Sequence, residues 1–196
     1  MSKIEVFGNA DTRLSAHLKC HLIQEFGAET LCVVGVIGEG TTKEIVANWE
    51  SPFEDSSLGS MFKKVGGAVQ KTTDMTSLTT LASTQVWGGN EPYLFDLVLK
   101  LYALFDPWME VEGALKALEK MMAPEVNKAM PGGRVPQRVM VELGGRMMLP
   151  DSFVKSLSIP LDAERSADGR MMRCTVNIQI GSIKMQNRSD IDLMYS

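Results

Sequence analysis

Positively charged residues are few in this sequence, and they are scattered along it. The 196 residues include 20 Lys and Arg against 24 Asp and Glu, which gives a formal net charge of −4 and a pI of about 5.3. The densest basic cluster is the pair Lys63 and Lys64. Proteins that bind nucleic acid through its phosphates usually carry a basic stripe or have a high pI. The charge balance therefore disfavours a dedicated nucleic-acid binder.

Cysteine is also scarce. The three cysteines, Cys20, Cys32 and Cys174, are odd in number, far apart and without a C-x-x-C pair. Such a set does not form a disulfide framework, and it is typical of a chain that folds in a reducing cytoplasm.

Long apolar runs are missing. No stretch approaches the roughly 20 apolar residues that a membrane-spanning helix needs. The first residues, MSKIEVFGNADTR, contain neither an apolar core nor a small-residue cleavage site. The sequence therefore predicts no membrane association and no signal peptide.

The only two histidines form half of a metal site. His17 and His21 would share one face of a helix, but the run H-L-K-C-H lacks the Glu of the H-E-x-x-H pattern. Zinc sites need three or four ligands, and Cys20 would point away from His17 on such a helix. We expect no bound metal.

Other catalytic patterns are absent as well. The chain has no G-x-S-x-G, and the glycine-rich run 35–42 lacks the lysine of a phosphate-binding loop. Glu110, Glu112 and Glu119 are expected on the solvated side of a helix rather than as a paired acid and base. The sequence thus predicts neither an enzyme nor a cofactor site.

Periodicity predicts the elements that are present. The apolar spacing of Leu14, Leu18 and Leu22 predicts a helix that Asn9 or Asp11 caps, that ends near Phe26 and that Gly27 terminates. A second helix is expected to begin at Asp106-Pro107, with an apolar stripe of Val111, Leu115, Leu118 and Met122. Strands are predicted at 3–7, 30–37, 93–105, 138–149, 153–161 and 171–183, and a loop at 125–136.

Two of these strands alternate clearly between apolar and polar residues. In 93–105, one face carries Phe95, Leu97, Leu99, Leu101, Ala103 and Phe105, and the other carries Asp96, Val98, Lys100 and Tyr102. In 171–183, the apolar positions are Cys174, Val176, Ile178 and Ile180, and the polar ones are Thr175, Asn177 and Gln179. Asp168-Gly169 lies in a loop long enough for a hairpin before this last strand.

The segment 38–84 differs from the rest in composition. It is rich in Gly, Ser and Thr and has little periodicity. Its few apolar groups would hardly offset the entropy of ordering its backbone. We interpret it as a long extended loop, which is either floppy or ordered against another subunit.

Taken together, the elements predict one domain over residues 1–196. Strands in hairpin-like succession with two helices are typical of the α+β class with mostly antiparallel sheets.

Two blocks of residues carry a resemblance to a known family. The first contains Ser51-Pro52-Phe53, Gln70, Ser83-Thr84-Gln85-Val86-Trp87-Gly88-Gly89, Pro92, Ala103, Asp106, Val111 and the helix end Leu118 to Pro124. The second contains Gly144-Gly145, Leu149-Pro150, Phe153-Val154 and Asp168-Gly169. Over roughly two thirds of its length the chain resembles the baseplate hub and tube-initiator proteins of contractile-tailed bacteriophages. Arg170 departs from the Gly-Pro expected there, which a hairpin tolerates.

This resemblance implies a tail-tube-like split barrel or sandwich with a flanking helix. It further implies a homo-oligomeric, hexameric ring that joins the hub to the tail tube and initiates tube assembly. The implied partners are further copies of this chain, the tail tube protein and other baseplate hub proteins. Such a protein would fold in the host cytoplasm and reside in the virion, with genomic DNA passing through the ring without specific binding.

The candidate lumen-facing residues are Asp96, Thr175, Asn177 and Gln179, because barrel strands show alternate residues to the two sides. Lys100 lies among them and fits a lumen less well.

Other functions remain open. The chain could be a baseplate adaptor, a peptidoglycan-binding module or a tail assembly chaperone. A hydrolase whose site assembles only in the folded chain is a third possibility.

Overall fold

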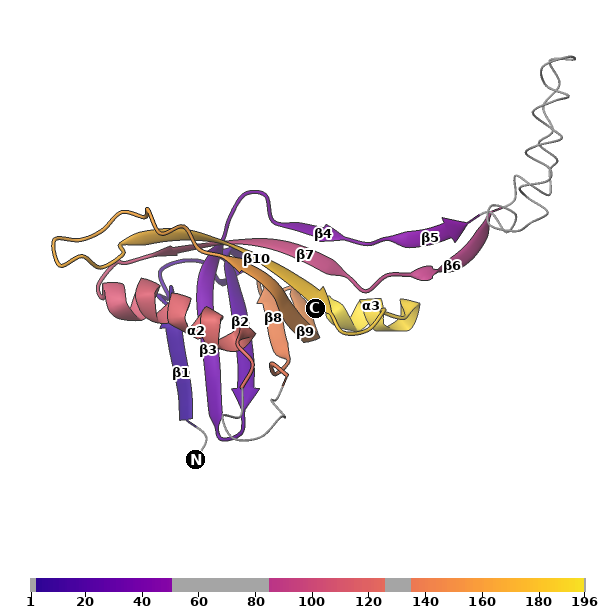
Figure 1. The fold of residues 1–196 in the computed structure, drawn as a ribbon, viewed down its shortest axis with the longest axis horizontal. Helices are drawn as coiled ribbons and strands as arrows, with labels where there is room; N and C mark the ends of the chain where they lie inside the picture. Colours follow the sequence, from indigo (N-terminus) through magenta and orange to yellow (C-terminus); the bar gives the residue numbers. More distant parts are fainter. Residues whose placement is uncertain (1–2, 51–84, 126–134, 196) are drawn as a thin grey trace, which may run out of the picture. The chain divides into compact units, whose positions relative to one another are not determined.

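The computed structural model describes residues 3–50, 85–125 and 135–195 (Figure 1). It confirms the α+β class with mostly antiparallel strands. The chain divides into a larger unit, Met1–Glu44 with Pro92–Ser196, and a smaller unit, Ile45–Glu91. Each is described by itself.

The larger unit is built around a closed barrel. Six of the described strands follow one another around it in the order β3-β2-β8-β9-β10-β7, and β7 pairs back onto β3. These strands are β2 (Lys19–Phe26), β3 (Glu29–Ile37), β7 (Leu94–Tyr102), β8 (Val139–Leu143), β9 (Met147–Ser158) and β10 (Arg173–Ser182). Two further strands extend the sheet: β1 (Lys3–Gly8) runs parallel to β3, and β4 (Thr42–Glu44) runs antiparallel to β7.

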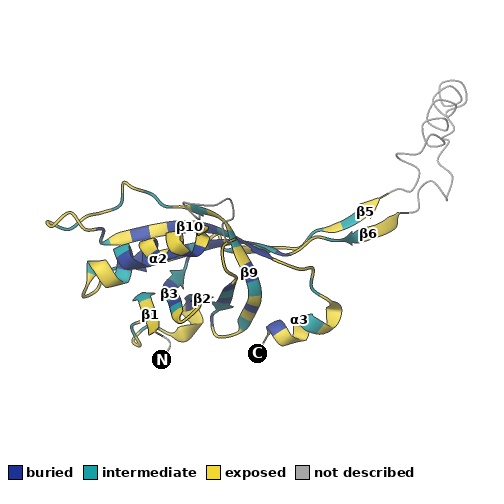
Figure 2. Cartoon of the chain, turned by 60° about the horizontal axis from the view of Figure 1, so that its bottom comes forward, coloured by how far each residue is buried: buried dark blue, intermediate teal, exposed yellow. Residues whose placement is uncertain are grey.

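Alternating residues fill the barrel. Along β10 and β7, the apolar positions predicted from the sequence point inward and are buried: Phe95, Leu97, Leu99, Leu101, Cys174, Val176, Ile178 and Ile180. The banding of buried and exposed residues along β10 is visible in Figure 2. Of the predicted apolar face of 93–105, Ala103 and Phe105 fall outside the strand, and Phe105 is 77% exposed.

A helix packs against this barrel. It begins with the π-helical turn η2 (Trp108–Glu112) and continues as α2 (Gly113–Met122), which lies against β1, β3 and β9 (Figure 1). As predicted, Val111, Leu115 and Leu118 are buried, but Met121 rather than Met122 completes the stripe. Gln24, buried at the barrel end of β2, donates its side-chain amide to the Met121 carbonyl at 3.0 Å and the Gln137 carbonyl at 2.9 Å.

The barrel closes where β7 meets β3, and glycine makes this closure possible. Val36 lies opposite Lys100 and Ile37 opposite Leu99. A Cβ atom on Gly35 would lie 2.4 Å from Cγ of Leu99, so only glycine lets the two strands approach this closely.

A turn at Glu39 and Gly40 follows directly, and after it β4 continues the pairing with β7. The Gly38 amide donates to the Val98 carbonyl at 2.7 Å. The Thr41 hydroxyl accepts from the Val98 amide at 3.1 Å and donates to the Gly38 carbonyl at 3.0 Å. Thr41 thereby gives the Val98 amide a hydrogen-bond acceptor at the point where the turn interrupts the pairing of β7. The glycine-rich run 35–42 therefore has a structural role. We call it the seam, because the barrel closes there between β3 and β7.

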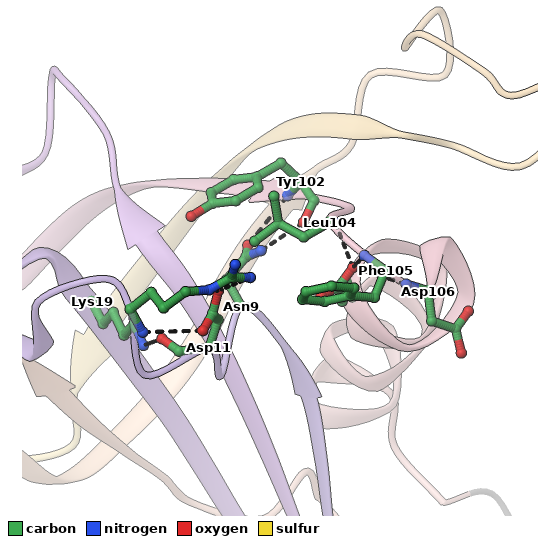
Figure 3. A network of polar contacts seen from close by, with 9 residues as sticks. Asn9, Asp11, Lys19, Tyr102, Leu104, Phe105 and Asp106 are labelled. Carbon is green, nitrogen blue, oxygen red and sulfur yellow. Dashed lines mark hydrogen bonds and ion pairs between the residues drawn. The ribbon is translucent and has the colours of Figure 1, made fainter.

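Asn9 fastens the far end of the same strand. Its side chain is buried, donates to the Tyr102 carbonyl at 2.6 Å and accepts from the Tyr102 amide at 3.2 Å (Figure 3). One side-chain amide thus satisfies both polar groups at the last residue of β7.

The predicted helix ending at Phe26 is wrong. Residues 19–26 form β2, which pairs with β3 across a two-residue turn at Gly27 and Ala28, with Gly27 at φ +61°. Only the short 3-10 turn η1 (Ala16–Leu18) is helical. The spacing of the leucines matched a helix by coincidence, because Cys20, Leu22 and Gln24 face the core with the period of a strand.

The second half differs in two places from its prediction. The single strand expected at 138–149 is a hairpin, in which β8 and β9 are joined by a turn at Gly144 and Gly145 with positive φ. Beyond β10, residues that the sequence marks only as polar form the helix α3 (Arg188–Met194). The described residues thus contain two helices longer than a single turn, of which α2 was predicted and α3 was not.

The predicted loop at 38–84 is only partly described. It contains β4 and β5 (Ala47–Glu50), while 51–84 lies outside the described residues, as does 126–134 of the loop predicted at 125–136. In the smaller unit, β5 pairs antiparallel with β6 (Val86–Asn90), and Trp49 lies opposite Trp87.

The seam can be tested with a pair of substitutions. Gly35→Ala should lower the free energy of unfolding by about 1–3 kcal/mol, because the new methyl group overlaps Leu99. Leu99→Ala alone should cost about 2–5 kcal/mol. The double variant should lose clearly less than the sum of the two, because truncation of Leu99 makes room.

Urea unfolding of the four proteins measures this coupling. Gly88→Ala is a matched control, since a Cβ there would make only ordinary contacts. Additive losses would show that Gly35 and Leu99 do not meet at the seam.

Candidate functional site

The four residues predicted to face a lumen lie together. In the register of β10 and β7, Thr175 lies opposite Lys100 and Gln179 opposite Asp96. The Gln179 amide donates to the Asp96 carboxylate at 3.0 Å. All four alternate with buried residues along their strands and point out of the barrel on one side.

Neighbouring strands extend this surface. Ser158 of β9 lies opposite Asn177, and Ser156 opposite Gln179. On the other side, Thr42 of β4 lies opposite Asp96. We call the outward-pointing set the polar face: Thr42, Asp96, Val98, Lys100, Ser156, Ser158, Thr175, Asn177 and Gln179. Sequence analysis missed the two serines, although the run Ser156-Leu157-Ser158 already alternates.

The polar face is electrically balanced. Its charged members are one carboxylate, Asp96, and one ammonium group, Lys100. Glu44 of β4 lies opposite one end of β7 and Arg173 of β10 lies opposite the other end, so the flanking charges also cancel. Two hollows border it: one of about 140 Å³ beside Asp96, lined in part by Ser156, and one of about 380 Å³ toward the Tyr102 end of β7, lined in part by Lys100 and Thr175.

The outer surface of the other barrel strands carries a row of apolar residues beside the polar pair His21 and Glu142. One row crosses four strands in register: Val6 of β1, Cys32 of β3, Ile23 of β2 and Met140 of β8. Ile4 at 65% and Met148 at 46% exposure flank this row. We call Ile4, Val6, Ile23, Cys32, Met140 and Met148 the apolar face.

The two histidines do not share a helix face, so the basis of that prediction is wrong. The imidazole of His21 lies within 3.6 Å of the Glu142 carboxylate beside the apolar face. His17 is in η1, and its Nδ1 lies 2.8 Å from the Gly144 carbonyl oxygen. Among the residues that the structure describes, no three His, Cys, Asp or Glu side chains gather as a metal site would require.

The glutamates of the helix hold backbone groups. One oxygen of Glu110 accepts from the amides of Leu104, Phe105 and Asp106 at 2.6, 2.8 and 3.1 Å (Figure 3). Glu112 accepts from the Met171 amide at 3.1 Å. Glu110 and Glu112 are thus half-buried and hold the chain around the start of the helix, while Glu119 is exposed as predicted.

Another depression lies between the β2–β3 hairpin and the end of α2. It has a volume of about 250 Å³, and its walls include Phe26, Leu31 and Pro124 with Lys120 at the rim. These walls provide no nucleophile beside a base. No helix in the described ranges is long and apolar enough to cross a membrane.

Burial makes two of the cysteine thiols harder to deprotonate. It raises the pKa of the Cys20 thiol, which points into the barrel, and more weakly that of Cys32 on the apolar face. A raised pKa keeps a thiol protonated and unreactive at neutral pH.

Thiol labelling checks these orientations. In the folded chain at pH 8, Cys32 should react with a disulfide reagent well before Cys20, which is fully buried and holds its proton more tightly. Mass spectrometry of the labelled peptides reads out the order, and urea should abolish the difference. Labelling of Cys20 as fast as Cys32 would mean that β2 presents its other side to the core.

Sequence comparison adds no relative to this picture. Neither a known protein-family model nor a curated protein matches the chain. The function must therefore be argued from the two contrasting faces of the barrel.

Proposed function

We propose that this chain is a structural component of a phage baseplate. Copies of it form a hexameric ring that joins the hub to the tail tube and initiates tube assembly. The observation that carries the proposal is the contrast between the polar face on β7, β10 and β9 and the apolar face on β1, β3, β2 and β8. A ring wall needs one side that meets water and DNA and other sides that meet protein.

The polar face has the character required of a lumen. Its side chains are mostly hydroxyls and amides, which water solvates well, and its charges cancel. DNA carries one negative charge for about every 1.7 Å of its axis, so a basic wall would bind it by releasing counterions. A neutral wall leaves the passing strand mobile.

The apolar face and the sheet edges fit burial between subunits. Ile4, Val6 and Met148 of the apolar face are exposed, and covering such side chains with a second subunit would stabilise an assembly. Among the described strands of the sheet, β1 and β4 each have one unpaired edge. Open edges invite pairing with another chain, which a ring of identical copies would supply.

Electron microscopy of the purified chain, alone and with tail tube protein, tests the proposal. Closed sixfold rings, or a shorter lag in tube polymerisation, are the expected results. A chain that forms no ring and does not change tube growth over a range of concentrations would contradict the proposal and favour an adaptor or a chaperone.

The charge of the lumen gives a second prediction. Thr175→Lys, Asn177→Lys and Gln179→Lys together should convert a chain that ignores duplex DNA into one that binds it. The affinity should fall with rising salt, because each phosphate contact releases counterions. Fluorescence anisotropy at several salt concentrations measures the slope.

Lysines at Thr12, Gln85 and Ser189, which are exposed residues outside the polar face, make a matched control of equal charge. Wild-type binding that is tight and salt-dependent would contradict a passive lumen. Equal binding by the two lysine variants would remove the special role of the polar face.

A further inference from the structure

The charges of the polar face are separated along its strands. Glu44 and Asp96 lie at one end of β7, whereas Lys100 and Arg173 lie toward the other. Four residues separate Asp96 from Lys100, which is about 13 Å along a strand. The Asp96 carboxylate already accepts from the Gln179 amide at 3.0 Å. The face is therefore balanced as a whole but positive at the end where β7 finishes.

Four outward side chains form a square at this positive end. Thr175 of β10 lies opposite Lys100 of β7, and the next outward pair in the register is Arg173 with Tyr102. All four alternate with buried residues, so they stand on the same side of the sheet. The two cations are diagonal neighbours, with Cβ atoms about 7 Å apart, and two hydroxyl groups occupy the other corners. We call these four the donor quartet, because each side chain can donate a hydrogen bond.

The donor quartet borders the hollow of about 380 Å³ at this end of the polar face. The other residues that line the hollow carry no charge: Leu101, Ala103, Leu104 and Cys174. A volume of this size lies within the range of pockets that hold small ligands. The hollow thus combines two positive charges with room for a small anion.

The two cations have no counter-charge of their own. Among the described residues, no ion pair and no side-chain hydrogen bond involves Lys100 or Arg173. Burial, and to a lesser degree the Asp162 carboxylate, raises the pKa of the neighbouring Cys174 thiol, yet Asp162 does not pair with Arg173. The Glu110 carboxylate already accepts from three backbone amides. Two like charges at this separation repel each other, so an anion between them would replace repulsion with attraction.

We propose that the donor quartet binds the phosphate group of a small phosphomonoester. Such a group carries between about 1.5 and 2 negative charges at neutral pH and accepts several hydrogen bonds, which matches two cations and two hydroxyl groups. The Arg173 guanidinium can donate two parallel bonds to it, while the Lys100 ammonium acts as a point charge. The uncharged remainder of the hollow takes the organic part of the ester. This inference goes beyond the proposed function and does not depend on ring formation.

Phosphorus NMR titrations of the full chain test the assignment, with phenyl phosphate and inorganic phosphate as probes at constant ionic strength. Phenyl phosphate should bind with a dissociation constant below about 1 mM. Inorganic phosphate should bind about threefold or more weakly, because it leaves the uncharged walls of the hollow uncovered. Tighter binding of inorganic phosphate would overturn the assignment to an ester.

Three substitutions examine the donor quartet directly. Lys100→Met and Arg173→Met each remove one charge and keep much of the side-chain bulk. Each should weaken the binding of phenyl phosphate about tenfold, and the two together should abolish it. Thr175→Val removes a hydroxyl group at nearly constant shape and should weaken binding about threefold. A loose attraction to exposed cations would not respond to that last change.

A matched control removes the same two charges elsewhere. Lys155→Met with Arg188→Met changes exposed residues outside the donor quartet and should leave binding as in the wild type. Thermal unfolding adds a second readout, because a ligand that binds only the folded state raises Tm. Phenyl phosphate should raise the Tm of the wild type and of the control, but not that of the Lys100→Met, Arg173→Met double variant. The cooperative melting of the double variant shows that it is folded.

The remaining outcomes overturn the inference. These are a dissociation constant above about 1 mM for phenyl phosphate, unchanged binding by the double variant, or an equal loss in the control. Duplex DNA that displaces phenyl phosphate from the wild type would assign the donor quartet to nucleic acid and would also contradict the passive lumen. Binding of phenyl phosphate by a chain that never forms rings would support this site and count against the proposed function alone.

Discussion

The close approach of β7 to β3 is the constraint on which the rest of this structure depends. A sheet that curls into a barrel must bring two strands together along a seam, and here the seam runs through Gly35, Gly38 and Thr41. Any side chain at Gly35 would force Leu99 to shift. Because β3 pairs with β1 along its first part and with β7 only at Val36 and Ile37, the sheet closes and yet keeps free edges.

Closure also separates the two outer faces. In a flat sheet all outward residues would share one side, whereas a barrel turns β7, β10 and β9 away from β1, β3 and β2. Serine, threonine and amide side chains therefore collect on one side of the molecule, and Val6, Ile23 and Met140 on another. The proposed ring function uses this division: an inert wall toward DNA, and apolar surface toward protein.

The sequence predicted the elements whose period is unambiguous. Both β7 and β10 alternate over nearly their whole length, so their buried and exposed sides, including Thr175 and Gln179, could be assigned before the fold was known. The assignment of β2 failed because leucines spaced by four also satisfy a period of two, and only pairing with β3 and β8 decides between them. Neither the Ser156 and Ser158 extension of the polar face nor the row through Cys32 could be found without the strand register, which is a property of tertiary contacts.

The N-terminal segment around Asn9 contacts the chain where β7 ends and the helix begins. Asn9 holds both polar groups of Tyr102, and the chain leaves β7 immediately afterwards. Three residues later Phe105 is fixed by the carboxylate of Glu110, and the Arg13 side chain that lies over its ring is anchored by Asp11. The same N-terminal segment thus holds the last residue of β7 and places a cation over the Phe105 ring.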